Sequence, residues 1–306
     1  MNSAKTSSKG HVEPSILGGA VDTHVHSGPD IVPRVADDIE TARMASNAGF
    51  AAIVLKNHHE STAARAQIAE SVNGLISIFG GLVLNSSACG GFNPDAVRIT
   101  MKMRGKIVWM PTVSAKNHIR FIHEAKYSEH VGAISAGLEE EGLSPLDEEG
   151  RIISSVREIL DIIAESDAIL ATGHLSSHEI CALIVEAKLR GVERILVTHP
   201  EAPQIEMPVD VQRDVAKLGV YFERCYYSVL AGYPLDRMLE EARSVGFEST
   251  IFASDLGQEH NPPPAEGLLD LYYALRAVGM NTIEWRTAIA RNPRALLALS
   301  NDVGES

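Results

Sequence analysis

The stretch AVDTHVH, residues 20–26, is a short apolar run that ends in two histidines. The apolar part predicts a buried strand over Ala20–Thr23. Side chains two residues apart on a strand point to the same side, so His24 and His26 can bind one metal ion together as a bidentate pair. Two unrelated polar residues at the end of a strand would look the same. The remainder of the chain has to decide between these interpretations.

Apolar runs of the same kind recur along the whole chain. Most of them lack polar alternation, which is typical of parallel strands that are buried on both faces. The predicted strands are Ala20–Thr23, Ala51–Leu55, Ile76–Leu84, Ile107–Met110, Ala168–Thr172, Arg194–Thr198, Val220–Glu223 and Thr250–Ala253.

Helical patterns lie between these runs, with Ser, Asp, Asn or Pro at their starts and Gly after most ends. The predicted helices are Asp37–Ala48, Ser61–Asn73, Pro94–Arg104, Ser154–Ser166, His178–Arg190, Val209–Leu218, Leu235–Val245 and Ala265–Val278. Alternating strands and helices over 306 residues predict a single α/β domain, a (β/α)₈ TIM barrel preceded by a polar tail over residues 1–15. An open doubly wound sheet normally carries a glycine-rich phosphate loop after its first strand, and the sequence has none there.

One stretch is too long for an ordinary loop of such a barrel. Residues 114–151 form an insertion after the fourth predicted strand and carry acidic runs at 139–141 and 147–149. A solvated hairpin on the rim and a lid over the barrel mouth are the two interpretations. We expect the histidines of this insertion to be solvated: His118, His123 and His130.

Composition excludes several classes of protein. Lys and Arg number 27 against 40 Asp and Glu, and the formal net charge of −13 argues against nucleic-acid and anionic-membrane partners. No apolar stretch reaches the roughly 18–20 residues that cross a bilayer. Three widely spaced cysteines match neither a disulfide framework nor a paired metal motif. The first ten residues lack the apolar core of a signal peptide. We therefore expect a cytoplasmic protein with a small-molecule substrate.

Three further predicted strands end on residues that bind metals. The fifth strand is followed by His174, the sixth by His199 and the eighth by Asp255. The carboxyl ends of all strands of a (β/α)₈ barrel meet at one mouth, so these side chains should join His24 and His26 there. Imidazole and carboxylate favour Zn²⁺, Mn²⁺, Fe²⁺ or Ni²⁺ over harder cations. The sequence thus predicts a divalent metal site, with Zn²⁺ as the first choice.

This set of positions resembles the amidohydrolase superfamily. Its pattern is Asp-x-His-x-His on the first strand, His on the fifth and sixth, and Asp on the eighth. The segment ARNPRALLAL, residues 290–299, is similar to the superfamily's Asn-Pro-Ala-x-x-Leu-Gly-Leu helix. The resemblance spans Asp22–Leu299. It implies a TIM barrel that holds one or two divalent metals and hydrolyses amide or ester bonds, although some members deaminate or decarboxylate.

The resemblance also implies roles for single residues. His24, His26, His174 and Asp255 match the metal ligands and the catalytic acid, and His199 matches a position that binds a second metal or touches substrate. Asp255 would then take a proton from the metal-activated water and pass it to the leaving group. The metal, with His199 or Lys56, would stabilise the oxyanion.

One departure from the superfamily concerns a second metal. Binuclear members usually carry a carboxylated Lys or a Glu on the fourth strand, where this chain reads WMPT, residues 109–112. The second strand instead ends at Lys56. This residue is a carbamate ligand, a cation for a substrate carboxylate, or a side chain that extends past the rim into water.

Two further residues are candidates for contact with the substrate. His58 follows the second strand and is expected beside the site rather than as a metal ligand. Arg34 either holds an anionic substrate or forms an ion pair with Asp37 or Asp38.

Three functions remain open. The first is a metal-dependent hydrolase of a small polar substrate with an amide, cyclic amide, ester or lactone bond. The second is a metal-dependent decarboxylase, which suits a mononuclear centre without a ligand on the fourth strand. The third is a non-catalytic metal-binding protein, which the presence of Asp255 disfavours.

The superfamily resemblance implies a homo-oligomer, and a net negative surface does not prevent a defined association. We expect light scattering at micromolar protein concentration to report a particle larger than the 33.0 kDa chain. A particle of the mass of one chain would contradict this prediction.

Overall fold

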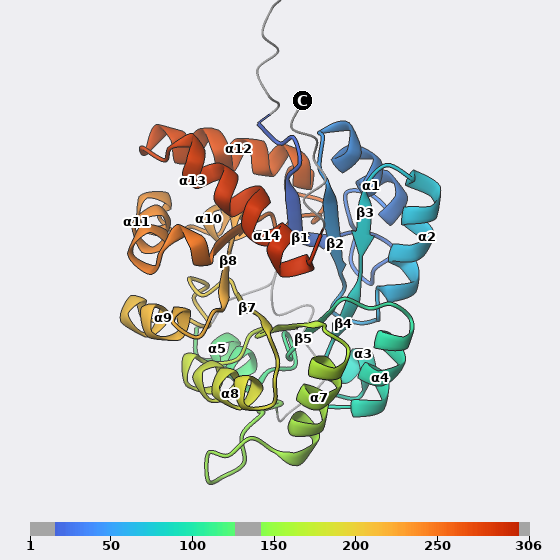
Figure 1. Ribbon diagram of the computed structural model, residues 1–306, viewed down its shortest axis with the longest axis vertical. Helices are drawn as coiled ribbons and strands as arrows, with labels where there is room; N and C mark the ends of the chain where they lie inside the picture. The colour runs from blue at the N-terminus through green and yellow to red at the C-terminus, as the bar shows by residue number, and fades with distance from the viewer. Residues whose placement is uncertain (1–15, 126–141, 300–306) are drawn as a thin grey trace, which may run out of the picture.

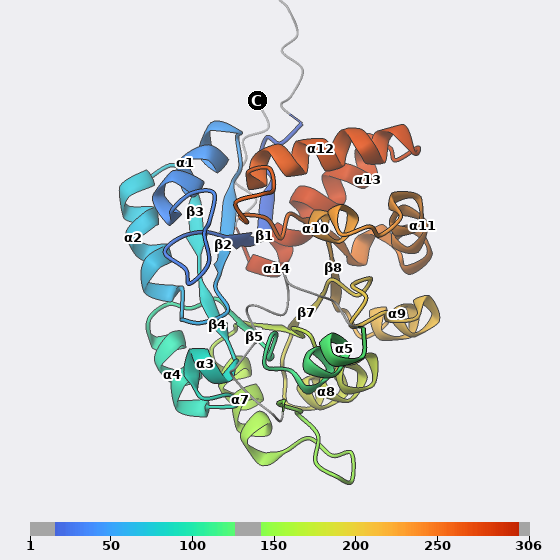
Figure 2. The ribbon, with the colours of Figure 1, turned by 180° about the vertical axis from the view of Figure 1, so that it is seen from behind.

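Parallel strands lie at the centre of the molecule and helices cover them on the outside (Figures 1 and 2). The computed structural model describes residues 16–125 and 142–299. The ladders between the named strands are all parallel. These strands are β1 Val21–His26, β2 Ala52–Lys56, β3 Ser77–Phe79, β4 Gly81–Val83, β5 Ile107–Trp109, β6 Ile169–Ala171, β7 Arg194–Thr198, β8 Tyr221–Cys225 and β9 Thr250–Ala253.

The predicted helices lie close to helices of the structure, and side chains cap the starts of some of them. Asp37 accepts a hydrogen bond from the Glu40 amide at the start of α1, and Ser176 and Glu179 form a capping box at the start of α8. No helix in the described segments is long and apolar enough to cross a membrane. The helices are α1 Asp38–Asn47, α2 Ala63–Asn73, α3 Ser86–Cys89, α4 Pro94–Lys102, α5 Lys116–Ala125, α7 Ser154–Glu165, α8 Ser177–Leu189, α9 Val209–Ala216, α10 Tyr226–Leu230, α11 Leu235–Val245, η1 Phe247–Ser249, α12 Pro264–Ala277, α13 Thr282–Arg286, η2 Thr287–Arg291 and α14 Asn292–Leu297.

The third barrel strand is interrupted, so the prediction of one continuous strand over Ile76–Leu84 is wrong. β3 pairs with β2 and β4 pairs with β5, and Gly80 separates them. A Cβ on Gly80 would lie 2.3 Å from the Thr62 carbonyl oxygen, and one on Gly81 would lie 1.9 Å from a backbone oxygen of β5. The bare backbone allows the strand to change partners at this point. With β3 and β4 counted as one strand, the predicted (β/α)₈ barrel is confirmed.

Hydrogen bonds between the first and the last strand close the ring. The Asp255 amide donates to the His24 carbonyl at 2.9 Å, and the His26 amide donates to the Leu256 carbonyl at 2.8 Å. Val25 and Leu256 form a parallel bridge at the same place. The closure therefore brings the end of β1 beside the residues that follow β9.

The barrel interior is apolar at one end and polar at the other. Its apolar cluster includes Val54, Trp109 and Leu196 from the strands, together with Leu296 and Leu297 from α14. α14 packs against β1 and β9 and fills the amino end of the barrel. Burial of a leucine side chain contributes about 1.5–3 kcal/mol, so this plug also stabilises the closed ring. The polar side chains gather at the opposite, carboxyl end.

The insertion at 114–151 contains a helix, α5, that the sequence did not predict. Its inner face carries the buried residues Asn117 and His118, so the expectation that His118 is solvated is wrong. The Asn117 side-chain amide donates to the carbonyl oxygens of His174 at 3.1 Å and Gln204 at 2.6 Å. These bonds hold the first turn of α5 against the barrel mouth.

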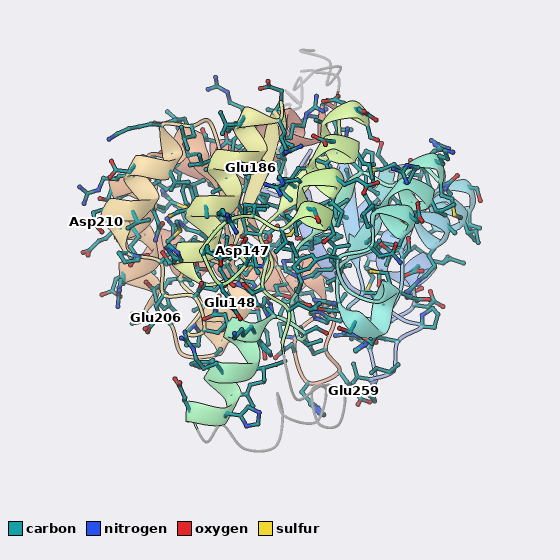
Figure 3. All side chains as sticks on the ribbon, turned by 90° about the horizontal axis from the view of Figure 1, so that it is seen from below. Asp147, Glu148, Glu186, Glu206, Asp210 and Glu259 are labelled. Carbon is teal, nitrogen blue, oxygen red and sulfur yellow. The ribbon has the colours of Figure 1, made fainter. Side chains whose placement is uncertain are left out.

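The second half of the insertion includes a hairpin, closed by an antiparallel bridge between Leu146 and Ile152. His130 and the acidic run at 139–141 lie outside the described residues. The acidic residues of the sequence are spread over several elements of the described structure. Figure 3 labels carboxylates from this hairpin, two helices and two loops: Asp147, Glu148, Glu186, Glu206, Asp210 and Glu259.

Gly257 provides a test of the ring closure. Its φ is +127°, and a Cβ there would lie 1.7 Å from the His26 carbonyl oxygen. We expect Gly257→Ala to lower the free energy of unfolding, measured in urea, by about 2 kcal/mol or more, because it adds overpacking to backbone strain. Gly74→Ala is the matched control, since Gly74 also has a positive φ but no heavy atom lies within 4 Å of the new Cβ. Equal losses in both variants would show that the close approach at His26 does not matter.

Candidate active site

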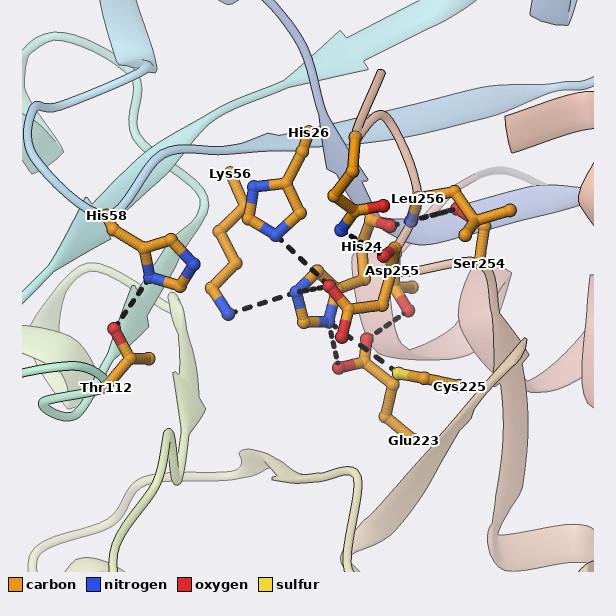
Figure 4. Close-up of polar contacts among 12 residues, drawn as sticks. His24, His26, Lys56, His58, Thr112, Glu223, Cys225, Ser254, Asp255 and Leu256 are labelled. Carbon is orange, nitrogen blue, oxygen red and sulfur yellow. Dashed lines mark hydrogen bonds and ion pairs between the residues drawn. The ribbon is translucent and has the colours of Figure 1, made fainter. Parts of the chain in front are cut away.

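Buried polar side chains from several strands meet at the carboxyl end of the barrel (Figure 4). β1 contributes two histidines and β2 contributes a lysine. The loops that follow β6, β7 and β9 contribute one residue each. The residues placed there are His24, His26, Lys56, His174, His199 and Asp255.

Asp255 lies between the two histidines of β1. Its Oδ1 atom is 3.0 Å from Nε2 of His24 and 3.1 Å from Nε2 of His26. Burial alone raises the pKa of Asp255, but the charge of His24 and the hydrogen bonds from both rings outweigh it and hold the pKa well below the usual value. Asp255 and His199 both have positive φ angles, +52° and +26°. Such strained backbone is concentrated at functional sites, and here it directs both side chains at the mouth.

Glu223 of β8 holds the other side of the His24 ring. Its Oε2 atom is 2.9 Å from Nδ1 of His24, and its Oε1 atom accepts the Thr23 hydroxyl at 2.5 Å. Burial lowers the pKa of His24, but the charges of Asp255 and Glu223 outweigh it and the pKa rises to about 8. Because Nδ1 faces a carboxylate, it keeps its hydrogen when the ring becomes neutral. Nε2 then carries the lone pair that a metal can take, in place of its contacts with Asp255 and Lys56.

Lys56 is part of this buried cluster. Its Nζ atom lies 3.0 Å from Nε2 of His24 and 5.7 Å from the centroid of the Trp109 ring. The residue is only 2% exposed, so the interpretation in which Lys56 extends past the rim into water is wrong. Burial lowers the pKa of the ammonium group.

A second group of histidines lies beside the first. The ring centroids of His26 and His58 are 5.0 Å apart, those of His58 and His174 are 6.3 Å apart, and those of His174 and His199 are 5.0 Å apart. Burial lowers the pKa of His199 to about 3, and it holds the pKa values of His58 and His174 well below the usual range. These imidazoles are therefore neutral at neutral pH, which is the form that binds metals.

His118 from α5 is the partner of His174. The two Nδ1 atoms are 3.0 Å apart, so one ring donates a hydrogen bond to the other. The other nitrogen of the His118 ring, Nε2, is buried without a hydrogen-bond partner among the described residues. Nδ1 of His199 is also buried without such a partner. Both nitrogens can accept a further polar group at the mouth.

Arg34 does not form the predicted ion pairs with Asp37 or Asp38. Its guanidinium lies 2.7 Å from Asp30 and 3.5 Å from Nδ1 of His26. Asp37 is occupied as the cap of α1, and Asp38 is paired with an arginine of α2. Arg34 thus reaches the site with its charge already balanced by a carboxylate.

His58 faces a neighbouring loop on its other side. Its Nδ1 atom is 2.8 Å from the hydroxyl oxygen of Thr112, which also accepts a hydrogen bond from the Asn85 side chain at 2.7 Å. The Asn85 side chain also donates to the His58 carbonyl oxygen at 3.0 Å. The ring is therefore held beside the cluster.

Three possible metal ligands lie close together. A ring nitrogen of His24, the sulfur of Cys225 and a carboxylate oxygen of Asp255 all lie within 4.8 Å of one another. His26 and the two histidines after β6 and β7 surround this group without belonging to it. A mixed set of nitrogen, oxygen and sulfur donors fits a divalent transition metal.

Sequence reasoning missed Glu223 and Cys225. The predicted strand Val220–Glu223 ends on a carboxylate, as the other strands end on histidine or aspartate, so the signal for Glu223 was present. Cys225 was missed because the actual strand continues two residues further than predicted. Alternate residues of β8 face the barrel interior, which places both side chains at the mouth.

The strands and helices form a TIM barrel, and solved structures share this fold. An amidohydrolase from Pseudomonas aeruginosa matches with a TM-score of 0.59, 11% identity, and coverage of 92% of this chain and 96% of that chain. A dihydroxybenzoic acid decarboxylase from Polaromonas sp. JS666 with bound manganese matches with a TM-score of 0.56 and 9% identity, and the match covers 92% of this chain and 97% of that chain. A phosphotriesterase from Mycobacterium tuberculosis matches with a TM-score of 0.54 and 13% identity, and the match covers 94% of this chain and 95% of that chain. At the level of the fold, the predicted resemblance to the amidohydrolase superfamily is confirmed.

The chain belongs to the family of unknown function DUF6282, whose model matches residues 19–223. The matched segment begins just before β1 and ends within β8, so it includes all the histidines of the cluster. No curated protein matches the chain.

His118 generates a prediction about pH. Burial lowers its pKa to about 4, so the unfolded chain binds this proton first as the pH falls below 6.5. The stability that depends on the neutral ring is therefore lost as the pH falls from 6.5 towards 4. In metal-free protein, we expect His118→Gln to reduce the slope of unfolding free energy against pH by up to about 1.4 kcal/mol per unit between pH 6 and 4.5.

The measurement is a set of urea denaturation curves across this pH range. His123→Gln, on the exposed side of the same helix, controls for the loss of an imidazole. If both variants change the slope equally, burial of His118 is not the cause.

Proposed function

We propose that this protein is a metal-dependent hydrolase that cleaves an amide, cyclic amide, ester or lactone bond in a small polar substrate. The observation that carries the proposal is the position of Asp255, whose Oδ1 atom lies between Nε2 of His24 and Nε2 of His26 at a buried barrel mouth. Enzymes with the same fold, named above as hydrolases and a decarboxylase, support it.

The residues at the mouth fit one or two divalent ions, with Zn²⁺ as the first choice. Neutral imidazoles surround the cluster, and Nδ1 of His199, which is buried without a partner among the described residues, can accept a ligand. A bound divalent ion lowers the pKa of a water molecule towards neutrality and polarises a carbonyl group. The residues that would hold it are His24, His26, His174, His199 and Asp255.

Asp255 is suited to move the proton of the attacking water. Its carboxylate is ionised at neutral pH, and its side chain retains 12% exposure towards the mouth. It can accept a proton there and return it to the leaving group within one short hydrogen-bond distance. The closure of β1 onto the segment after β9 fixes the position of this carboxylate.

Lys56 is suited to hold an anionic part of the substrate. Its ammonium group is buried and makes no direct ion pair among the described residues, although the charges of Asp255 and Glu223 act on it from a greater distance. A substrate carboxylate or a developing oxyanion would supply a direct ion pair. Arg34 is less suited to this role because Asp30 already pairs with it, and His58 would contact the same end of the substrate.

A decarboxylase on the same barrel is the second candidate. The fourth barrel strand, β5, is followed by Met110 and Pro111, so it supplies neither the Lys nor the Glu of a binuclear centre. One of the solved neighbours is named as a decarboxylase with bound manganese. Carbon dioxide release and the incorporation of labelled oxygen from water into the product distinguish the two reactions.

Asp255→Asn separates a role in proton transfer from a role in metal binding. Asn tolerates the left-handed backbone that Asp255 adopts, so the strand end should keep its shape. We expect the variant to retain most of its metal and to lose activity by roughly 10²–10⁴-fold, because a positioned base contributes that much. Metal content by elemental analysis and turnover of a screened substrate are the two measurements.

The variant with both His24→Ala and His26→Ala is the comparison, and it should lose stoichiometric metal. Near-normal turnover in Asp255→Asn would refute the mechanism. Full metal retention in the double variant would refute the metal site.

A further inference from the structure

We propose that Cys225 is a ligand of the metal ion at the barrel mouth and that its sulfur makes the site select Zn²⁺ over Mn²⁺. The proposal rests on the proposed function for the presence of an ion. It adds a donor that the pattern of histidines and aspartate at the strand ends does not contain.

Cys225 is aimed into the site by the alternation of β8. Arg224 faces outward, where its guanidinium bonds Gln212 at 2.8 Å, whereas Glu223 and Cys225 face the barrel interior. The Cys225 sulfur lies 3.8 Å from Nδ1 of His24, and the residue has no exposed surface. Its amide donates to the Glu201 carboxylate at 3.1 Å, which fixes the end of the strand.

The spacing of the donors suits one ion. The sulfur, a His24 nitrogen and an Asp255 oxygen lie within 4.8 Å of one another. The ligand atoms of a tetrahedral zinc site lie about 3.4–3.7 Å apart, as follows from bond lengths of about 2.0–2.3 Å. Side-chain movements of about an ångström are therefore enough to bring these three donors to a shared ion.

The surroundings of Cys225 differ from those of an ordinary buried cysteine. Cys89 and Cys181 pack against the apolar cluster between the strands and the outer helices, as expected for small apolar side chains. Cys225 belongs to none of the apolar clusters of the described chain. Its neighbours are the imidazole of His24 and the carboxylates that flank that ring. A thiol among metal-type donors, rather than among apolar groups, is placed for coordination.

Coordination by sulfur has a consequence for the choice of metal. When the ion binds, the S–H bond gives way to a sulfur–metal bond and one proton is released to solvent. Thiolate is a soft ligand that favours Zn²⁺, whereas Mn²⁺ prefers oxygen ligands. The single sulfur thus shifts the site towards zinc.

Cobalt provides a test that does not depend on knowing the substrate. Metal-free protein is titrated with Co²⁺, and the absorption spectrum is recorded, since thiolate ligation produces an intense charge-transfer band in the near ultraviolet. We expect this band in the wild-type protein and in the Cys89→Ser/Cys181→Ser double variant, whose one remaining cysteine is Cys225. The band should be absent in Cys225→Ser.

Competition titrations then test the selectivity. Cys225→Ser should bind Zn²⁺ at least tenfold more weakly than the wild type, with little change in its affinity for Mn²⁺. The double variant is the matched control and should keep the wild-type preference. Because that variant retains Cys225, the spectrum decides the question even if Cys225→Ser does not fold.

The outcomes separate this proposal from the proposed function. Stoichiometric Co²⁺ binding without the band overturns the role of Cys225 and leaves the metal site in place. The same holds if Cys225→Ser keeps the full preference for Zn²⁺. A protein that binds no divalent ion overturns the metal dependence of the proposed function as well.

Discussion

The closure of the first strand onto the last is the constraint on which the molecule depends. Two backbone hydrogen bonds, from Asp255 to His24 and from His26 to Leu256, complete the ring of parallel strands. The residues that make these bonds also carry the side chains of the site. A barrel that did not close here would lose both the seal around its apolar interior and the meeting of two imidazoles with one carboxylate. Stability and chemistry are therefore fixed by the same few atoms.

The fold could be predicted from the sequence wherever one local signal decided the outcome. Arg194–Thr198 and Thr250–Ala253 are apolar runs with clear limits, and β7 and β9 have the predicted bounds. The strand at Ile76–Leu84 was predicted as continuous because its apolar character is continuous. Its interruption at Gly80 depends on the backbone of Thr62, which approaches from another part of the chain. The glycine pair at 80–81 is a local sign of an interruption, but the local pattern does not say which part of the chain approaches it.

The candidate site shows the same division between local and distant information. Histidines and aspartate directly after apolar strands could be predicted, since barrel geometry brings all strand ends to one mouth. His118 could not, because its position depends on the docking of α5 through Asn117 onto the loop after β6. The ion-pair partner of Arg34 was wrong for a related reason. Asp37 and Asp38 are near in sequence, but helix capping and a neighbouring helix already engage them.

The plug formed by α14 closes the amino end of the barrel in the part of the chain that the structure describes. Leu296 and Leu297 fill the amino end, so a small molecule that reaches the histidines must leave past the same rim by which it entered. Exchange at a site that is open at one end is sequential, because a departing molecule blocks the next arrival until it has left. Residence time at the carboxyl end then limits how often a new molecule can bind there. The packing of α14 at the amino end thereby makes release of one molecule at the carboxyl end precede binding of the next.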